Sequence, residues 1–530
     1  MIERTLRPSY VLLLLAVACS PPASAPDTGA QGGGGSTADA GGASAGAAGS
    51  SVPALGGTAG TGVAAGAGGT GGAGMAGGGA AGAGGTPVAT PPNVVFILID
   101  DLGYGDLSAY GNPDIETPNI DAVADQGTRF TQFYVASPVC SPSRAGFNTG
   151  QVPGRQRIHG HFADRAANAA REMPDFLPLT APAIARQLKA AGYATAHFGK
   201  WHLGGGRDVG DAPWPTEYGF DESFTSFEGL GDRVLVEGDG LSEESAALGQ
   251  GEIQWALQRE ETALYVDKAV DFMTRHQADR FLLHVWLNEV HDPFDPIPEL
   301  MEKYSAFSAN KYEQQYFATI DSMDQQLGRL MAAIDELGLG DDTLVLIASD
   351  NGPTAWPRYY NEGVAPPGST DGLRGRKWSL YEGGIREPLI VRWPGKVPAG
   401  MVNDTTVLHA ADYLPTIIAI TNAELPESPP DGEDVSDVLL GAERARTSPL
   451  FWEYGQYATI QPGLTVDQSP PLAVRQGDWK LLMNWDGSGI ELYDLASDRA
   501  ESENLAAAQP AVTQELEQKL TAWRDEVWAP

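Results

Sequence analysis

The sequence predicts an α/β fold built on a large, mostly parallel mixed sheet that is sandwiched by helices. Two continuous apolar runs with β-branched residues, at 94–99 and 344–348, predict parallel strands buried on both faces, and two further strands are expected between them at residues 193–198 and 281–287. Segments with helical periodicity separate these runs, at residues 181–192, 261–276 and 313–338. Alternating strands and helices favour a parallel sheet covered by helices. The chain from residue 93 onward is long enough for one large domain with a smaller appendage.

The first 19 residues are predicted to be an export signal. Arg4 and Arg7 precede an apolar stretch from Val11 to Ala18, which is typical of a secretory signal. The stretch is too short to cross a bilayer, which takes about 20 apolar residues. Small residues end at Cys19 and resemble the bacterial lipoprotein signal, in which the cysteine is lipidated; an ordinary cleaved signal peptide is the alternative. We expect export to the periplasm or cell surface, with this lipid as the only membrane anchor.

Residues 20–92 are predicted to be a disordered tether. They are rich in Gly, Ala, Ser, Thr and Pro, and they include no aromatic residue, Lys, Arg or Glu. Such a segment cannot bury enough apolar surface to offset the entropy lost on ordering. A flexible coil of this length would span about 50 Å and would hold a folded domain clear of a membrane.

The chain is strongly acidic, with a formal net charge of −35 at pH 7. A surface of this sign disfavours nucleic acid and anionic lipid as partners, because both are polyanions. Any anionic substrate would need a locally positive site.

Polar and charged residues follow all four predicted strands. In chain order these residues are Asp100 and Asp101, Lys200 and His202, His291, and Asp350 and Asn351. Because ligands of parallel sheets sit beyond the carboxyl ends of the strands, we expect these side chains to form one site.

Three carboxylates and one amide in this set offer oxygen ligands only. Calcium prefers oxygen donors, whereas zinc sites usually recruit His or Cys. We therefore expect Ca²⁺ here, with Mg²⁺ as the alternative. Without a cation, the three carboxylates of Asp100, Asp101 and Asp350 would be crowded together at considerable cost.

Cys140 stands in the stretch CSPSRAGFNTG and is one of only two cysteines in the chain. A lone cysteine is most often a small buried apolar residue, and a disulfide to Cys19 is disfavoured because Cys19 lies in the leader. The stretch resembles the signature of the type I sulfatases, whose cysteine is oxidised to formylglycine by a dedicated enzyme. The matching residues are Cys140, Pro142, Ser143, Arg144, Thr149 and Gly150.

The resemblance extends over nearly all of residues 93–530 and includes NVVFILIDDLGYGD, GKWHLG, HDPFDP, SDNG and LRGRKWSLYEGGIREP. It is a resemblance to sulfatases of the arylsulfatase and N-acetylgalactosamine-6-sulfatase kind, in the alkaline phosphatase superfamily. It implies a catalytic domain over residues 93–445. The stretches AVRQGDWKLL and ELYDLASDRAESENLA resemble the family's smaller domain. They imply an α+β domain over residues 446–530, with a short antiparallel sheet and a terminal helix.

The resemblance also implies a role for each site residue. It makes Cys140 the formylglycine nucleophile and gives proton transfers to His202 and His291. Arg144 and Lys200 would hold the nucleophile. The sulfate would be bound by Lys200, His291 and Lys377. The implied metal ligands are Asp100, Asp101, Cys140, Asp350 and Asn351.

A hydrated aldehyde suits sulfate ester hydrolysis because it carries two hydroxyls on one carbon. One hydroxyl attacks sulfur and displaces the alcohol; deprotonation of the other expels sulfate and restores the aldehyde. A serine or cysteine would instead be left with a stable sulfo-enzyme bond. The expected partners are therefore a sulfated small molecule or saccharide and, during maturation, the formylglycine-generating enzyme. Whether the substrate is a carbohydrate or an aryl sulfate is left open.

Several further residues are candidates for the substrate pocket. His159 and His161 either line the pocket or cap a turn. Tyr104 and Trp378 are expected to pack around the site rather than react. Candidates for a sugar platform are Trp214, Trp356, Arg358 and Arg376.

Two other functions are compatible with parts of this pattern. A phosphonate or phosphodiester hydrolase of the same superfamily can share the cysteine signature. A non-catalytic, surface glycan-binding protein would leave Cys140 unconverted, although the full set of acids, bases and metal ligands argues against it.

Overall fold

The computed structural model describes residues 90–455 and 462–528. The predicted signal, lipidated Cys19 and most of the tether lie outside these residues. Eleven strands form one large sheet. These strands are β1 (Asn93–Ile99), β2 (Thr128–Tyr134), β3 (Ala194–Lys200), β4 (Glu222–Ser226), β5 (Arg233–Val236), β6 (Ile253–Ala256), β7 (Phe281–Trp286), β8 (Thr343–Ser349), β9 (Arg386–Arg392), β10 (Met401–Asn403) and β11 (Leu408–His409).

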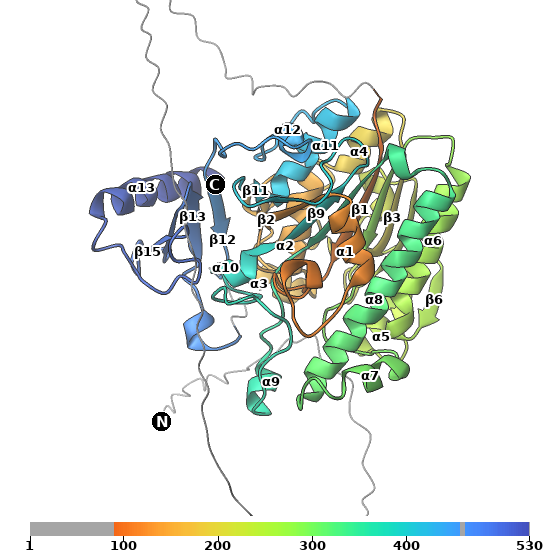
Figure 1. Ribbon diagram of the computed structural model, residues 1–530, viewed down its shortest axis with the longest axis horizontal. Helices are drawn as coiled ribbons and strands as arrows, with labels where there is room; N and C mark the ends of the chain where they lie inside the picture. The colour runs from red at the N-terminus through yellow and green to blue at the C-terminus, as the bar shows by residue number, and fades with distance from the viewer. Residues whose placement is uncertain (1–89, 456–461, 529–530) are drawn as a thin grey trace, which may run out of the picture. The chain divides into compact units, whose positions relative to one another are not determined.

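Helices lie on both faces of this sheet (Figure 1). The α-helices of the described residues are α1 (Pro118–Asp125), α2 (Cys140–Thr149), α3 (Arg165–Ala170), α4 (Ile184–Ala190), α5 (Gly240–Ala247), α6 (Glu261–Arg275), α7 (Pro298–Tyr304), α8 (Lys311–Glu336), α9 (Pro357–Asn361), α10 (Glu382–Ile385), α11 (Tyr413–Thr421), α12 (Ser436–Leu439) and α13 (Pro510–Val527).

The sheet is mostly parallel, as predicted. Its strand order is β10-β2-β9-β8-β1-β7-β3-β4-β5-β6, with β11 paired to β2. Strand β1 is central, since Val94 is in register with Leu282 of β7 and Leu344 of β8, both parallel. Only the pairs of β9 with β2 and β8 are antiparallel in this sheet.

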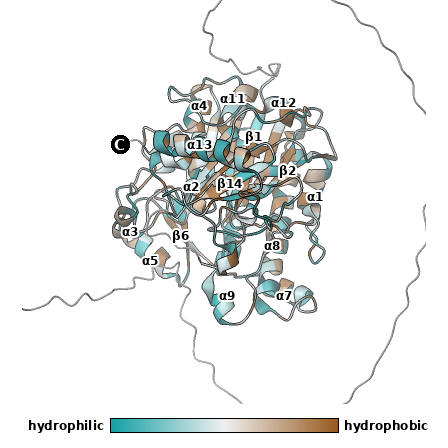
Figure 2. Ribbon diagram, turned by 90° about the vertical axis from the view of Figure 1, so that its left-hand side faces the viewer, coloured by the Kyte–Doolittle hydropathy of each residue, from teal (hydrophilic) through white to brown (hydrophobic). Residues whose placement is uncertain are grey.

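Alternate residues of β1 face two separate apolar cores. Val94, Phe96 and Leu98 belong to a core completed by α2, α4 and α11. The intervening residues Val95 and Ile97 belong to the core under α1, α6 and α8. Both faces are thus buried, which explains why the strand is apolar throughout. Figure 2 shows hydrophobic residues gathered in the interior and hydrophilic ones on the peripheral helices.

The four predicted strands are confirmed as β1, β3, β7 and β8, with small differences at their ends. The largest difference is in β3, which runs to Lys200 rather than ending at residue 198, because the chain continues to pair with β4. The helix predicted over 181–192 is shorter, Ile184–Ala190. Pro182 and an extended Ala183 precede it, and Gly192 at φ +89° follows it.

The C-terminal part forms the predicted short antiparallel sheet. Its order is β12 (Leu450–Glu453), β13 (Leu472–Gln476), β14 (Trp479–Met483) and β15 (Glu491–Asp494). Helix α13 packs on β13 and β14 through Leu516, Leu520 and Trp523.

A buried ion cluster joins this small sheet to the larger part of the molecule. Lys480 of β14 lies 2.9 Å from the carboxylates of both Glu382 in α10 and Glu501, and none of the three side chains is exposed. The Trp452 indole also donates to the backbone oxygen of Val135, at 2.8 Å.

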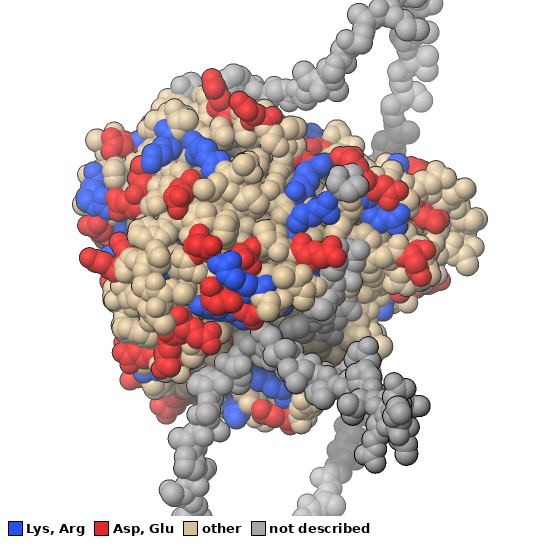
Figure 3. Space-filling view, turned by 180° about the vertical axis from the view of Figure 1, so that it is seen from behind, with Lys and Arg blue, Asp and Glu red and all other residues tan. Residues whose placement is uncertain are grey.

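Acidic and basic side chains are interspersed on the face seen in Figure 3. Among the helices of the described chain, none is both long enough and apolar enough to span a bilayer.

Candidate active site

The carboxyl ends of the central strands deliver buried polar groups to one place. Asp100 and Asp101 follow β1, Asp350 and Asn351 follow β8, and Lys200 is the last residue of β3. All five are at most 2% exposed. The Asp101 amide donates to the Asp350 carboxylate at 3.3 Å, so neighbouring strand ends are tied together. The structure therefore brings together the residues that the strand-end argument selected.

Cys140 is the first residue of α2, and its thiol is buried. Its sulfur and one carboxylate oxygen from each of Asp100 and Asp350 all lie within 4.8 Å of one another, and the same holds for Cys140, Asp101 and His291. The first amides of a helix have no partners within that helix and favour an anion near its N-terminus. Position 140 is thus suited to a group that meets a negatively charged ligand.

Three cations pair with the three carboxylates. Lys200 donates to Asp100, and Lys377 donates to Asp101 at 2.6 Å. Arg144 reaches Asp350 through two nitrogens, at 2.8 and 2.7 Å. Arg144 also donates to the Lys200 backbone oxygen at 2.9 Å and stacks on Trp286, with the guanidinium carbon 5.4 Å from the ring centre.

The donor set fits a hard cation. Three buried oxygens have no hydrogen-bond partner, namely Asp100 Oδ1, Asp101 Oδ2 and Asn351 Oδ1. The amide nitrogen of Asn351 donates to Asp101 at 2.7 Å, so its oxygen is the atom left for a ligand. Oxygen donors of this kind suit calcium or magnesium.

Crowding of the carboxylates perturbs their ionisation. Burial and the adjacent Asp100 carboxylate raise the pKa of Asp350 to about 7, even though Arg144 binds it. Burial also opposes ionisation of Asp100, but Lys200 and the other nearby positive groups lower its pKa. A divalent cation would relieve this repulsion.

Two predicted histidines reach the same cavity. His202 is 2% exposed, and neither ring nitrogen has a hydrogen-bond partner. Burial and the charge of Lys200 lower the pKa of His202 well below its usual range, so its ring is neutral. His291 is more exposed; its Nε2 lies 3.7 Å from Asp101 and its Nδ1 is 2.6 Å from the Asp292 carbonyl oxygen.

The cavity above Cys140 has an aromatic wall. Trp356 and Trp378 stack with ring centres 5.2 Å apart and planes 19° apart. The cavity encloses about 480 Å³, including its open mouth. It is lined by Val139, Cys140, His161, His202, Phe227, His291, Asp292, Trp356, Lys377 and Trp378.

Of the two candidate histidines in RIHGHF, the structure brings only His161 to this cavity. His159 instead lies 2.7 Å from Glu453 and stacks on Trp528. Among the sugar-platform candidates, Trp356 lines the cavity, whereas Trp214 packs beside Val209 and Leu230.

Arg358, Arg376 and Tyr104 are not among the lining residues of this cavity. Arg358 pairs with Asp292 at 3.2 Å and therefore supports a lining residue. Arg376 donates to the Thr354 backbone oxygen at 2.8 Å. Tyr104 packs edge-on against Tyr110, 5.3 Å between ring centres.

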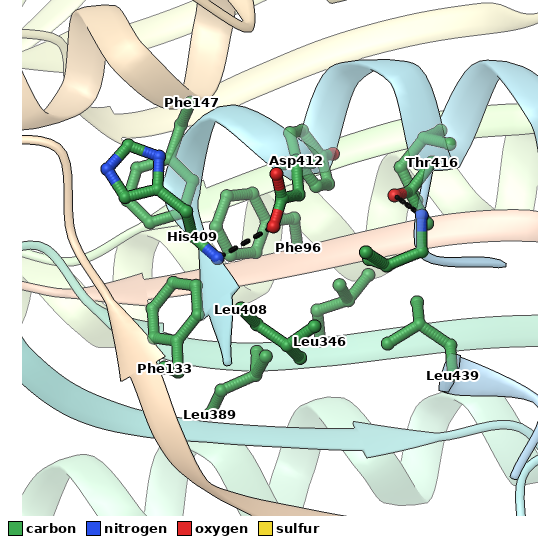
Figure 4. A pocket seen from close by; sticks show the side chains of 13 residues that line it. Phe96, Phe133, Phe147, Leu346, Leu389, Leu408, His409, Asp412, Thr416 and Leu439 are labelled. Atoms are coloured by element: carbon green, nitrogen blue, oxygen red, sulfur yellow. Dashed lines mark hydrogen bonds between the residues drawn. The ribbon is translucent and has the colours of Figure 1, made fainter. Parts of the chain in front are cut away.

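A separate cavity under α11 is apolar (Figure 4). Phe96, Phe133 and Leu346 are among its lining residues, and its polar groups bond to one another, as where the His409 amide donates to Asp412 at 2.8 Å. It shares no lining residue with the cavity above Cys140. We assign it to the packing of the core.

Phe227 is a lining residue that the sequence did not single out. It follows β4, a five-residue strand without a long apolar run, so no local pattern identifies it.

Comparison with known proteins agrees with this geometry. The sulfatase family matches residues 92–423, and the C-terminal region of N-sulphoglucosamine sulphohydrolase matches residues 375–526. The chain is 33% identical to arylsulfatase A of Bos taurus over 76% of this chain and 77% of that protein. It is 30% identical to N-acetylgalactosamine-6-O-sulfatase of Bacteroides thetaiotaomicron over 81% of this chain and 92% of that protein.

A solved structure has the same fold. Ps i-CgsB in complex with k-i-k-neocarrahexaose superposes with a TM-score of 0.69 and 25% identity, covering 83% of this chain and 93% of that one. With the family match, the two relatives and this fold in agreement, the chain belongs to the type I sulfatases of the alkaline phosphatase superfamily and is a sulfate ester hydrolase.

Proposed function

We propose that this sulfatase acts through a formylglycine made from Cys140, beside a Ca²⁺ ion held by Asp100, Asp101, Asp350 and Asn351. One arrangement carries the proposal: a buried cysteine at a helix N-terminus, in reach of three carboxylates that are each paired with a cation. The three unpartnered oxygens described above support the metal assignment. A bound Ca²⁺ would neutralise the carboxylates and withdraw charge from the sulfate oxygens.

The formal charge of the loaded site favours an anion. Three aspartates and one divalent cation give −1, and Arg144, Lys200 and Lys377 add +3, which leaves +2 in a protein of net charge −35. Lys200 and Lys377 are therefore proposed to bind sulfate together with His291. Fixed positive groups in a dry site stabilise charge that develops on the sulfate oxygens.

The proton transfers follow from the positions of the two histidines. In the first step, one hydroxyl of the hydrated aldehyde gives its proton to Asp350 and attacks sulfur, the ester S–O bond breaks, and His291 protonates the departing alcohol. In the second step, neutral His202 removes the proton of the other hydroxyl, the C–O bond to sulfate breaks, and the aldehyde forms again. Water then hydrates the aldehyde. Positioned acids and bases of this kind contribute about 10²–10⁴-fold each.

The substrate is proposed to be a sulfated carbohydrate or an aryl sulfate. The named relatives support both, since one is an arylsulfatase and the other acts on N-acetylgalactosamine 6-sulfate groups. The stacked Trp356 and Trp378 favour a ring, because aromatic faces bind the apolar faces of rings.

Mass spectrometry and kinetics test this proposal. The peptide with Cys140 should lose one sulfur and two hydrogens and gain one oxygen when the protein is made with a formylglycine-generating enzyme. Turnover of 4-nitrophenyl sulfate should vanish in Cys140→Ala and after chelation, and Ca²⁺ should restore the chelated enzyme. Full turnover with an unconverted thiol, or in Cys140→Ala, would overturn the mechanism. A large preference for a phosphate diester of the same phenol would assign a different reaction.

A further inference from the structure

A second, larger cavity adjoins the cavity above Cys140. The two share Phe227, His291 and Asp292. The second encloses about 940 Å³, including its open mouth. Its other lining residues are Asp100, Lys200, Val236, Glu237, Gly238, Asp239, Leu241, Gln258, Glu261, Asn288 and Pro293.

One end of this cavity is the reaction centre. Asp100 and Lys200 line it there, and His291, the proposed proton donor to the departing alcohol, stands on the boundary between the two cavities. An alcohol group protonated by His291 would therefore have room on this side. The volume suffices for a sugar unit, since small-ligand sites in proteins measure about 300–1,000 Å³.

The far wall comes from the segment between β5 and α6 and carries negative charge. Glu237 is exposed at the mouth. Asp239 caps α5 by accepting from the Ser242 amide at 2.8 Å. Neither carboxylate has a cation opposite it within the lining, because Lys200, the only Lys or Arg among the described lining residues, is already paired with Asp100.

The inner part of the wall is uncharged. Burial raises the pKa of Glu261 to about 8, even though Asn288 donates to it at 2.8 Å, and this favours the neutral carboxyl at pH 7. Asp292 is balanced by Arg358 at 3.2 Å. Val236 and Leu241 add apolar surface. Amide and neutral carboxyl groups beside apolar ones suit hydroxyls on a ring.

We propose that this cavity binds the alcohol part of the sulfate ester and selects alcohols that carry no second anionic group. The preferred class is a monosulfated sugar whose other substituents are neutral or amine-bearing. Uronates and disulfated units are disfavoured, because Glu237 and Asp239 repel them and the described lining residues offer no free Lys or Arg to bind them. This inference rests on the proposed sulfatase mechanism and specifies its substrate.

The test uses three phenyl sulfates that differ only in a meta substituent, namely aminomethyl, hydroxymethyl or carboxymethyl. Wild-type enzyme, the Glu237→Lys variant and the Glu252→Lys variant are compared at equal formylglycine content and about 0.01 M salt, where screening is weak. Glu252 is exposed in the same segment between β5 and α6 but does not line the cavity, so Glu252→Lys makes the same charge change elsewhere.

For the wild type, kcat/KM is expected to be about five-fold lower for the carboxymethyl ester than for the aminomethyl ester. This is the size of effect expected when a carboxylate attracts one substituent and repels the other with weak screening. Glu237→Lys should reduce or reverse that ratio, and Glu252→Lys should leave it as in the wild type. Equal rates for all three esters, or equal shifts in the two variants, would overturn the cavity assignment while sulfate hydrolysis stands. Loss of hydrolysis of all three esters by converted enzyme would overturn the mechanism itself.

Discussion

At the scale of single residues, the surroundings of a histidine decide whether it can take part in the reaction. His202 and His197 are both buried and lack partners for either ring nitrogen, yet only His202 lines the cavity above Cys140. His197 lies among aromatic rings, 5.1 Å from both Trp201 and Trp286 between ring centres. Access to the reacting atoms, rather than protonation state, separates a proposed base from a core residue.

Removing His202 should separate the two proposed steps. In His202→Ala the first equivalent of alcohol should still be released rapidly, and steady-state turnover should fall by about 10²–10⁴-fold, because the base for sulfate release is gone. Rapid-mixing measurement of nitrophenol from 4-nitrophenyl sulfate would show a burst. Mass spectrometry would then find sulfate on the peptide containing position 140. The half-buried His276, which lines neither cavity, is replaced by Ala as the control. Slowing of both phases together in His202→Ala would place His202 in the first step.

At the scale of elements, the small antiparallel sheet is held to the catalytic part by charges out of reach of water. Lys480 pairs with both Glu382 and Glu501, and the Tyr134 hydroxyl also donates to Glu382. Buried ion clusters are often no more stable than apolar packing, but removing one member leaves an uncompensated charge. This asymmetry makes Lys480 a sensitive position.

Replacing Lys480 by Met should lower the free energy of unfolding by about 3–5 kcal/mol. Urea denaturation followed by tryptophan fluorescence measures the change. Lys519→Met provides the comparison, because Lys519 pairs with Glu515 on the surface of α13 and its loss should cost at most about 1 kcal/mol. Similar values for the two variants would contradict the argument.

Glu433 should make stability depend on pH in the acid range. Burial opposes its ionisation, but hydrogen bonds from Thr447 and Ser448 lower the pKa of Glu433 to about 2. A carboxyl whose pKa is lower in the folded state stabilises the fold fully above its usual pKa of 4.5, and that contribution is lost as pH falls toward 2. Glu433→Gln should therefore be less stable at pH 7, and its deficit should shrink below pH 4.5.

Thermal unfolding of wild type and Glu433→Gln between pH 7 and pH 3 tests that expectation. The exposed Glu427, changed to Gln, is the matched control. A deficit that stays constant over this range would show that the carboxylate charge is not the cause.

The sequence was sufficient for the central strands and the polar groups at their ends. The core of β1 and of β8 is a continuous apolar run, and polar groups follow closely behind all four strands, so one stretch of chain reveals both. Phe227 and Glu237 could not be found in this way, because the cavity they line depends on how the short strands β4 to β6 extend the sheet. The partners of Lys480 were hidden for a similar reason, since Glu382 is far away in sequence.

At the scale of the whole molecule, the proposed positive site is embedded in a protein of net charge −35. Basic groups on the face in Figure 3 are interspersed with acidic ones, so none of that face forms a broad basic track. A long polyanion would thus be repelled over much of its length, while a single sulfate would feel mainly the nearby cations.

The dependence of kcat/KM on ionic strength should separate repulsion by the acidic surface from attraction by the cations of the site. Raising salt from about 0.01 M to about 0.15 M shortens the Debye length from about 30 Å to about 8 Å. Because repulsion by the distant surface is screened first, kcat/KM for a multiply sulfated oligosaccharide should rise several-fold more than for 4-nitrophenyl sulfate. Steady-state kinetics at fixed pH checks the prediction, and a parallel fall for both substrates would show that local attraction dominates for each.

The proposed catalytic residues and the proposed alcohol cavity lie at different parts of the large sheet, and this separation has an evolutionary consequence. Strands β1, β3, β7 and β8 lie in its interior and lead to the proposed reacting groups, whereas β5 and the segment after it, which line the proposed alcohol cavity, belong to its margin. Mutations at that margin can reshape what is recognised without touching the bond-breaking machinery. Specificity for new sulfated compounds would then evolve through substitutions in this margin, while the catalytic residues stay unchanged.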